Sequence, residues 1–175
     1  MAQFINPLNV IAQAGLGVGQ IVANLGCGSG FFATAAAQVV KDPGKVYAVD
    51  VQESKLEATM SSARHFGYKN VFVVKADLDK PLSGIPEGSC DLAIIGSVLH
   101  EARAREVLLQ NAYRVVKTGG KVLVVEWKKE RTPFGPALDA RIDQETVTRM
   151  FTSLGFRKER DLDADKFHYA MLFVK

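Results

Sequence analysis

Near-continuous apolar runs alternate with amphipathic segments along most of the chain. An apolar run with no polar side is typical of a strand covered on both faces, and apolar positions three or four residues apart predict a helix. Five runs predict strands, at residues 21–30, 45–50, 71–77, 90–101 and 121–127, the first and fourth running into loops. Because helical segments separate them, the pattern predicts the α/β class: a parallel sheet with helices on both faces.

Two segments between these strands have clear helical signatures. Residues 53–67 carry Leu56, Met60, Ala63 and Phe66 at helical spacing, and a glycine closes the segment. Residues 104–117 predict a second amphipathic helix, closed by the turn TGG before the last of the five strands. The strand at 71–77 is predicted to be buried and to end in an acid.

The last part of the chain predicts one helix and one hairpin. Asp143 precedes the helical segment 144–156 and is expected to cap it, with Gly155 near its end. Two strand-like runs then flank the acidic turn DLDAD, which predicts a hairpin.

Composition narrows the class of protein. At 175 residues and 47% apolar content, the chain suits one domain over residues 1–175, with residues 1–20 as a lid or helix before a core of 21–175. A net charge of +3 does not predict a nucleic-acid partner. The sequence shows neither a signal peptide nor an apolar stretch that could span a membrane. Cys27 and Cys90 are expected to be reduced, buried thiols, so we predict a cytoplasmic protein.

The stretch IVANLGCGSG carries the most specific chemistry. It predicts a strand, a loop with Gly26, Gly28 and Gly30, and a helix start, with Asp50 at the end of the next strand. Glycines let the backbone approach a ligand, and a carboxylate can accept hydrogen bonds from both hydroxyls of a ribose. The arrangement favours a bound nucleoside over a tight glycine turn with no ligand.

The spacing of the glycines distinguishes between nucleosides. A dinucleotide fingerprint needs G-x-G-x-x-G, but Phe31 stands where its third glycine would be, and a pyrophosphate needs bare amides there. A phosphate-binding P-loop is excluded, since no G-K-[ST] follows.

The loop LGCGSG with its downstream acid resembles the first two motifs of the class I S-adenosylmethionine-dependent methyltransferases. The run YRVVKTGGKVLVVE continues the resemblance, which covers nearly the whole chain. It implies a single doubly wound, Rossmann-like sheet of seven strands in the order 3-2-1-4-5-7-6, mostly parallel with an antiparallel last strand. It also implies that Asp77 contacts the adenine amine and that Leu78 packs on the ring.

The resemblance therefore implies S-adenosylmethionine as the cofactor and S-adenosylhomocysteine as its product. We expect the cofactor at the carboxyl ends of the strands, held by Asn24, Gly26, Cys27, Gly28, Gly30, Asp50, Val51, Asp77, Leu78, Gly96 and Ser97. One position departs from the family: an acid usually stands two residues before the first glycine, where this chain has Asn24. Asparagine keeps an acceptor oxygen and loses the charge, which predicts weakened cofactor binding.

The motifs that this chain lacks narrow the chemical class of the methyl acceptor. It carries no N-P-P-Y or D-P-P-Y after the fourth strand and no Pro-Cys nucleophile, which disfavours amino-group and cytosine methylation. The metal-dependent catechol type needs a second Asp at the end of the fourth strand, where this chain has Gly96 and Ser97. His100 and Glu101 lack the second histidine of H-E-x-x-H, so no metal site is predicted. The resemblance is greatest to the branch with ubiquinone/menaquinone-type and arsenite-type methyltransferases. Two cysteines disfavour arsenite, so we expect a small apolar or aromatic acceptor.

The expected reaction is an in-line displacement of a methyl group from a sulfonium, which mainly requires positioning and exclusion of water. His100 is the candidate general base if the acceptor must lose a proton, and Glu126 could act as a base or bind a cation. The alternatives are a His100 that packs beside the cofactor or bonds a backbone carbonyl, and a Glu126 in an ion pair with Arg141 or a lysine. The 128–142 loop is expected either to line the acceptor site or to be a plain surface loop.

Two other functions stay open. Asn24 and the lack of a certain base allow a non-catalytic protein that binds S-adenosylmethionine or S-adenosylhomocysteine, and Asp50 allows an NAD-binding oxidoreductase. The expected partner is a small-molecule acceptor, and an exposed helix could pair two copies of the chain as a homodimer. At the N-terminus, Phe4, Asn6 and Pro7 could lie over the cofactor as a short lid.

Overall fold

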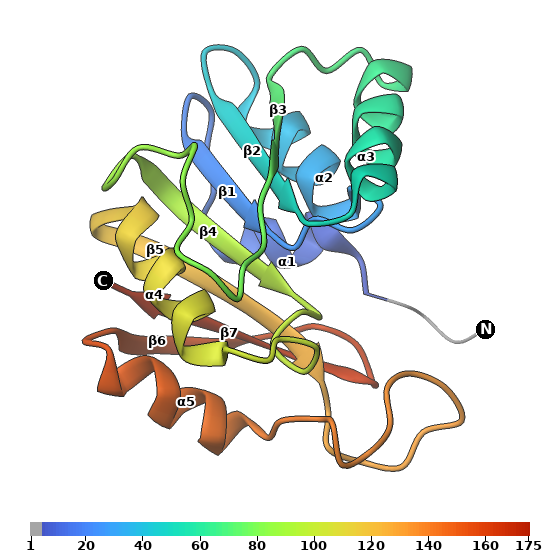
Figure 1. Ribbon diagram of the computed structural model, residues 1–175, viewed down its shortest axis with the longest axis vertical. Helices are drawn as coiled ribbons and strands as arrows, with labels where there is room; N and C mark the ends of the chain where they lie inside the picture. The colour runs from blue at the N-terminus through green and yellow to red at the C-terminus, as the bar shows by residue number, and fades with distance from the viewer. Residues whose placement is uncertain (1–4) are drawn as a thin grey trace.

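A single twisted sheet forms the centre of the molecule in the computed structural model, which describes residues 5–175 (Figure 1). The strands are β1 (Ile21–Leu25), β2 (Lys45–Asp50), β3 (Val71–Lys75), β4 (Cys90–Gly96), β5 (Val116–Trp127), β6 (Arg157–Leu162) and β7 (His168–Val174). The helices are α1 (Pro7–Gln13), α2 (Phe31–Val40), α3 (Glu53–His65), α4 (Arg105–Val115) and α5 (Gln144–Ser153).

The order of the strands confirms the predicted fold. The seven strands pair in the order β3-β2-β1-β4-β5-β7-β6. Pairing is parallel from β3 through β5, and β7 runs antiparallel to both β5 and β6. The strand order therefore reverses between β1 and β4, which is where ligands bind in sheets of this kind.

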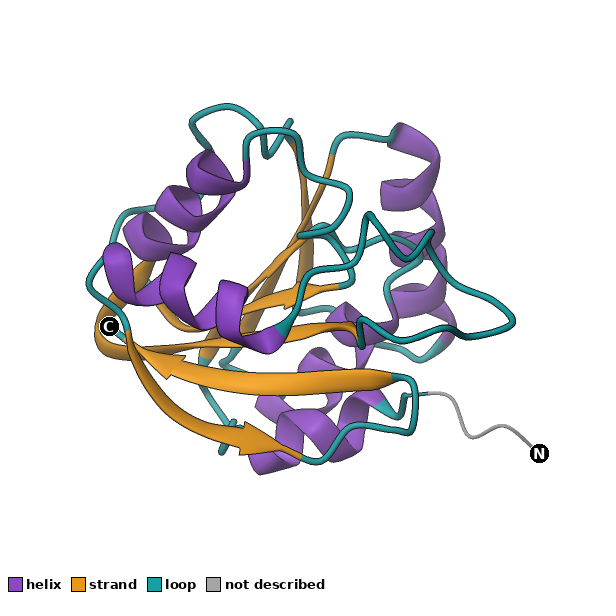
Figure 2. Cartoon of the chain, turned by 90° about the horizontal axis from the view of Figure 1, so that it is seen from below, coloured by secondary structure: helices purple, strands orange, loops and turns teal. Residues whose placement is uncertain are grey.

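Helices cover both faces of the sheet and make two separate cores (Figure 2). On one face, α4 and α5 bury Leu108, Leu109 and Phe151 against the sheet. On the other face, α1, α2 and α3 bury apolar side chains that include Ile11 and Leu56. The central strand β1 lies between the two cores, which explains why its apolar run is nearly continuous.

The prediction that residues 71–77 form a buried strand is wrong in two respects. β3 ends at Lys75, so Asp77 lies in the following loop, and Phe72 and Val73 are 45% and 40% exposed. β3 is the outermost strand on its side of the sheet, so it lacks the cover that central strands receive. Phe66, the last of the apolar positions at helical spacing in the preceding segment, is also exposed, and it lies just beyond the end of α3 at His65.

The turn predicted at TGG belongs instead to an irregular start of β5. This strand begins at Val116, which pairs with Cys90, and regular pairing resumes where Leu92 faces Lys121. The residues between them bulge out of the ladder, with Gly119 at a φ of 75°. The amide of Gly119 donates to the carbonyl of Lys175, so the bulge remains hydrogen-bonded to the end of the chain.

The predictions for the C-terminal region are confirmed. The side chain of Asp143 caps α5 by accepting from the Thr146 amide at 2.8 Å, and this bond holds the pKa of Asp143 below its usual range. Gly155 follows the helix at a φ of 93°, a conformation that favours glycine. The runs around DLDAD form the β6–β7 hairpin.

Among residues 5–175, none of the helices is both long and apolar enough to cross a membrane.

Candidate functional site

A cavity of about 960 Å³ opens at the carboxyl ends of the parallel strands. Its wall includes nine of the residues predicted to hold the cofactor: Gly26, Cys27, Gly28, Asp50, Val51, Asp77, Leu78, Gly96 and Ser97. These residues come from the ends of β1, β2, β3 and β4 and from the loops that follow them. The fold thus brings together segments that lie far apart in the sequence.

The glycine loop contributes to the cavity wall, and its three glycines serve different purposes. Gly26 and Gly30 are needed for packing, because a Cβ on Gly26 would collide with Val98 and one on Gly30 would lie 2.8 Å from the Thr59 hydroxyl. Gly28 has a φ of 51°, and a Cβ there would meet nothing within 4 Å. Gly28 therefore leaves open the space that a ligand would fill.

Asp50 joins the glycine loop to the start of α3. Its Oδ2 accepts from the Gly28 amide at 3.0 Å, and its Oδ1 accepts from the Gln52 amide at 3.0 Å. Each carboxylate oxygen has a second lone pair, so the residue can still accept hydrogen bonds from two hydroxyl groups in the cavity. This geometry suits a ribose diol.

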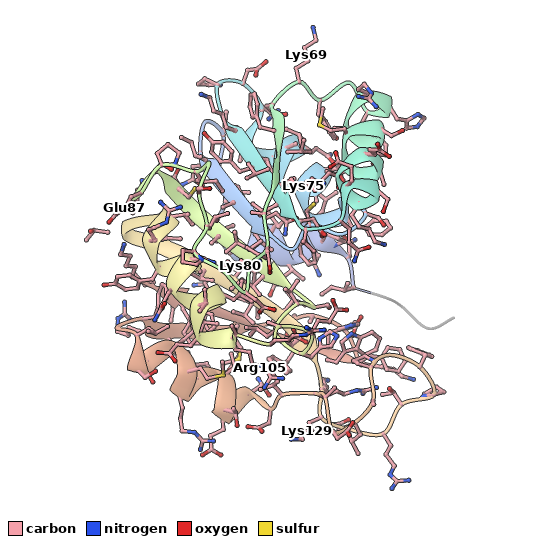
Figure 3. The ribbon with its side chains drawn as sticks, viewed as in Figure 1. Lys69, Lys75, Lys80, Glu87, Arg105 and Lys129 are labelled. Atoms are coloured by element: carbon pink, nitrogen blue, oxygen red, sulfur yellow. The ribbon has the colours of Figure 1, made fainter. Side chains whose placement is uncertain are left out.

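Asp77 and Leu78 also line the cavity. The Asp77 carboxylate accepts from the Asp79 amide at 3.1 Å and lies 3.2 Å from Lys80, whose side chain extends from the loop after β3 (Figure 3). These two contacts hold the pKa of Asp77 below its usual range, so the group is an anion at neutral pH. It can accept a hydrogen bond from an exocyclic amine, with Leu78 as an apolar surface beside it.

The end of β4 contributes two residues with special backbone requirements, Gly96 and Ser97. A Cβ on Gly96 would lie 3.0 Å from the Phe32 ring, so only glycine fits there without a shift of that ring. Ser97 adopts a φ of 56°, which is uncommon outside glycine, and its amide donates to the Val125 carbonyl at 2.8 Å. Such backbone conformations occur often at ligand sites.

Two predicted cofactor residues do not reach the wall. Gly30 begins α2 behind the loop. Asn24 lies within β1 with 1% of its surface exposed, and its Nδ2 is 3.5 Å from the Ile94 carbonyl. The Oδ1 of Asn24 has no hydrogen-bond partner among the residues that the structure describes. This buried acceptor belongs to β1, two residues before the first glycine of the loop.

The two cysteines are free and buried. Cys27 contributes to the cavity wall, but burial raises its pKa to about 11, and its sulfur contacts the Thr59 hydroxyl. Burial likewise raises the pKa of Cys90 to about 11. Both groups are neutral thiols at physiological pH, so neither is an activated nucleophile.

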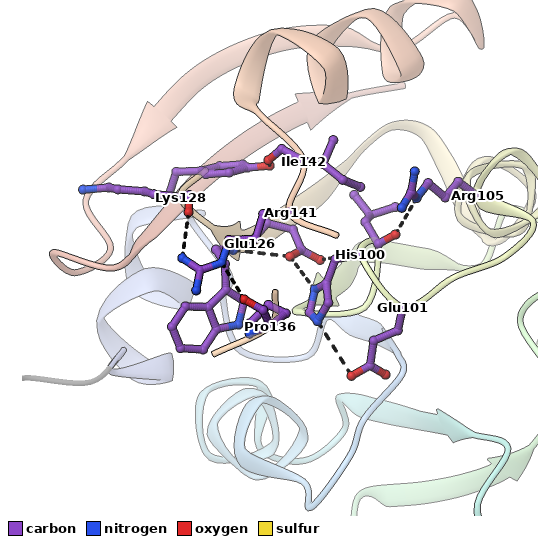
Figure 4. A network of polar contacts seen from close by, with 11 residues as sticks. His100, Glu101, Arg105, Glu126, Lys128, Pro136, Arg141 and Ile142 are labelled. Carbon is purple, nitrogen blue, oxygen red and sulfur yellow. Dashed lines mark hydrogen bonds and ion pairs between the residues drawn. The ribbon is translucent and has the colours of Figure 1, made fainter. Parts of the chain in front are cut away.

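His100 and Glu126 form a direct pair (Figure 4). The Nδ1 of His100 is 2.8 Å from Oε2 of Glu126, and their side chains are 8% and 0% exposed. His100 therefore bonds a carboxylate rather than a backbone carbonyl, and it is not among the residues that line the cavity. Its neighbour Glu101 is one of those wall residues.

The ion pair considered between Glu126 and Arg141 does not form. Arg141 is buried, and its guanidinium donates instead to the loop around it: to the carbonyls of Lys128, Glu130, Phe134 and Pro136 and to the hydroxyl of Thr132. Its Cζ also lies 5.3 Å from the centre of the Trp127 ring. Arg141 thus organises the 128–142 loop.

Several wall residues were not predicted as ligand contacts. They include Ile5, Phe31, Phe32, Lys55 and Glu101. Phe31 is 74% exposed at the first turn of α2, a position that indicates a ligand surface more than a core residue. Of the predicted lid residues, Pro7 reaches the wall, Asn6 caps α1, and Phe4 lies outside the described residues.

Comparison with known proteins agrees with this geometry. Residues 17–159 match the family described as a methyltransferase domain. The ubiquinone/menaquinone biosynthesis C-methyltransferase UbiE of Escherichia fergusonii is 32% identical over 129 residues, which make up 73% of this chain and 51% of that protein. The chain therefore spans about half the length of this relative.

Solved structures show the same fold. An S-adenosylmethionine-dependent methyltransferase from Aquifex aeolicus has a TM-score of 0.90 and 26% identity, over 98% of this chain and 91% of that one. The [4+2]-cyclase SpnF has a TM-score of 0.79 at 17% identity, over 95% of this chain and 79% of that one, and is similar in fold alone.

Proposed function

Because the chain belongs to the class I S-adenosylmethionine-dependent methyltransferases, we propose that it transfers a methyl group from S-adenosylmethionine to a small-molecule acceptor. The observation that carries this proposal is the cavity at the carboxyl ends of the strands. It combines an open position at Gly28, two carboxylates at Asp50 and Asp77, and an apolar surface at Leu78.

The residues at the wall fit the parts of the cofactor. Asp50 has free lone pairs for the ribose hydroxyls, and the anionic Asp77 can accept from the adenine amine. The open space at Gly28 leaves room for the rest of the molecule. The buried Oδ1 of Asn24 does not reach the cavity wall, so it can help to hold the cofactor only through a water molecule or a backbone group.

The cofactor supplies a methyl group on a sulfonium, which is already an excellent donor. The protein then has to hold the acceptor in line with the methyl group and exclude water, and both tasks depend on the shape of the cavity. A volume of about 960 Å³ lies at the upper end of the range for ligand pockets, so it suits two molecules bound side by side.

We propose a small apolar or aromatic acceptor. Ile5, Pro7, Phe31 and Phe32 give one part of the wall an apolar character, and Phe31 presents most of its ring to solvent. The relative from Escherichia fergusonii acts as a C-methyltransferase in ubiquinone/menaquinone biosynthesis. Since the match covers about half of that protein, its acceptor is only one member of the class to be tested.

We also propose that residues 1–175 act as a single domain in the cytoplasm, as a monomer or a homodimer. Two free, buried thiols suit a reducing compartment, where disulfides rarely form.

The main alternative is a protein that binds the cofactor without transferring its methyl group. Asn24, in place of the usual acid, is the observation that favours it, and the similarity of fold to a cyclase agrees that this fold hosts more than one chemistry.

The test is transfer of label from methyl-tritiated S-adenosylmethionine to a panel of small aromatic compounds with hydroxyl, ring-nitrogen or activated-carbon nucleophiles. We expect label in at least one acceptor and inhibition by S-adenosylhomocysteine. Binding of S-adenosylhomocysteine with no transfer across the panel would favour the non-catalytic alternative.

A further inference from the structure

Three ionisable groups form a chain of contacts from strand β5 to the cavity wall. Glu126 at the end of β5 is fully buried, and His100 in the β4–α4 connection is next to it (Figure 4). Glu101, the residue after His100, lines the cavity. The Nδ1 of His100 is 2.8 Å from Glu126, and its Nε2 is 3.7 Å from Oε1 of Glu101.

Glu126 fixes which nitrogen of His100 carries the proton. The amides of His100 and Trp127 also approach the Glu126 carboxylate, at 3.4 and 3.3 Å. A carboxylate surrounded by N–H donors accepts hydrogen bonds, so the Nδ1 of a neutral His100 must be the protonated nitrogen. The lone pair of that imidazole is then on Nε2, the nitrogen turned toward the cavity wall.

The charges around His100 favour its protonation. Burial by itself would lower the pKa of His100, but the hydrogen bond and charge of Glu126, together with the charge of Glu101, raise that pKa above its ordinary value. Arg105 at the start of α4 acts in the opposite sense and is outweighed. An imidazole with a raised pKa is a stronger base once it is deprotonated.

Glu101 both lines the cavity and contacts the Nε2 of His100. Its side chain is 76% exposed and its contact with His100 is longer than a hydrogen bond, so little holds it in place. A rotation of this side chain would let an acceptor group in the cavity reach Nε2.

We propose that Nε2 of His100 is the general base of methyl transfer and that Glu126 is its positioning residue. This inference rests on the proposed function, and it restricts the acceptor to compounds that carry a proton on the group that becomes nucleophilic. Transfer then forms a bond from the acceptor to the methyl carbon and breaks the sulfur–methyl bond, whose electron pair stays on sulfur. The proton of the acceptor moves to Nε2.

The first test is ¹⁵N NMR of the imidazoles in protein saturated with S-adenosylhomocysteine. The sequence has only three histidines, so His65→Gln, His100→Gln and His168→Gln assign every signal. We expect neutral His100 to carry its proton on Nδ1 and to titrate above its ordinary pKa. In Glu126→Gln the pKa should fall, and both tautomers should appear.

His168 supplies a matched control, because its Nδ1 lies 2.9 Å from Asp165 in a buried pair outside the cavity. Asp165→Asn should change the signals of His168 and leave those of His100 unaltered. A wild-type His100 protonated on Nε2, or a titration that Glu126→Gln leaves unchanged, would overturn the inference.

The second test measures label transfer to the acceptor that takes up most label in the panel above. His100→Gln should lose transfer by roughly 10²- to 10⁴-fold, the usual contribution of a general base, while it binds S-adenosylhomocysteine as the wild type does. Wild-type transfer rates in His100→Gln would overturn the base role and leave the proposed function intact. A wild-type protein that binds S-adenosylhomocysteine but methylates nothing would overturn the transfer reaction and the base role with it.

Discussion

Asp50 is the residue on which the cofactor site most depends. It accepts the amide of Gly28 and retains lone pairs for two hydroxyl groups of a ligand. Asp50→Ala should weaken binding of S-adenosylhomocysteine by roughly 1–3 kcal/mol in calorimetry, because buried hydroxyls lose a charged partner. Glu87→Ala is the control, since Glu87 is an exposed carboxylate in the loop before β4, at the other end of the strands (Figure 3). Equal affinities in the two variants would show that the ribose is held elsewhere.

His100 makes stability depend on pH in a defined direction. Its pKa is raised in the folded protein, so protonated His100 stabilises the fold fully below the ordinary value near 6.5, and this contribution is lost as the pH rises through the folded pKa. Compared with His100→Gln, the wild type should therefore lose free energy of unfolding in urea titrations as the pH rises above about 6.5. A difference between the two proteins that stays constant, or grows with pH, would contradict the raised pKa.

The sequence identified His100 and Glu126 separately, because each follows a strand at the expected edge of the sheet. It did not predict that they pair. His100 lies in the connection after β4 and Glu126 lies in β5, so the two meet only because β4 and β5 pair in parallel. The local sequence does not determine the register of that pairing. The sequence also could not predict that the Oδ1 of Asn24 lacks a hydrogen-bond partner, because this depends on which residues pack around β1.

The glycine loop shows how an element can be predicted while the roles inside it cannot. Spacing predicted the loop, but only the packing distinguishes Gly26 and Gly30, which avoid collisions, from Gly28, which keeps the cavity open. β3 was mistaken for a buried strand because an apolar edge strand and a central strand have similar sequences. The early start of β5 was missed because the bulge contains two glycines that resemble a turn.

Gly28→Ala tests the role of the loop. The added methyl group enters the cavity, so S-adenosylhomocysteine affinity should fall at least about tenfold, a loss of roughly 1.4 kcal/mol. Gly88→Ala is a matched control, because Gly88 also has a positive φ, of 60°, with open space around its Cβ, and lies outside the cavity. Both variants should lose about 1–2 kcal/mol of stability from the left-handed backbone, and only the first should lose binding. Undiminished binding by a folded Gly28→Ala would contradict the assignment.

Substitution of Arg141 tests whether this residue holds the 128–142 loop in place. Lysine cannot reproduce the fork of donors that reaches several carbonyls at once, so Arg141→Lys should lower the free energy of unfolding by about 1.5–3 kcal/mol. Limited proteolysis should then cut this loop faster than in the wild type. Arg131→Lys, at an exposed position in the same loop, should stay within about 0.5 kcal/mol. Similar effects in both variants would show that Arg141 does not hold the loop.

At the scale of the whole molecule, sequence and structure agree on the architecture. The alternation of strands and helices predicted a parallel sheet, and resemblance to a family supplied the strand order, which pattern alone does not determine. The sequence predicted the part of the cavity wall that lies at the carboxyl ends of the strands, but not its apolar part. The apolar part of the wall combines Ile5 and Pro7, around the start of α1, with Phe31 and Phe32 at the start of α2. This tertiary arrangement has no signature in the sequence.

The central claim, that this cavity holds S-adenosylmethionine, is tested most directly by calorimetric titration of the protein with S-adenosylhomocysteine beside a titration with NADH. We predict one site of micromolar affinity for S-adenosylhomocysteine, weakened at least about tenfold in Gly28→Ala and unchanged in Gly88→Ala, with no binding of NADH. Binding of NADH without S-adenosylhomocysteine, or S-adenosylhomocysteine binding that Gly28→Ala leaves unchanged, would contradict it.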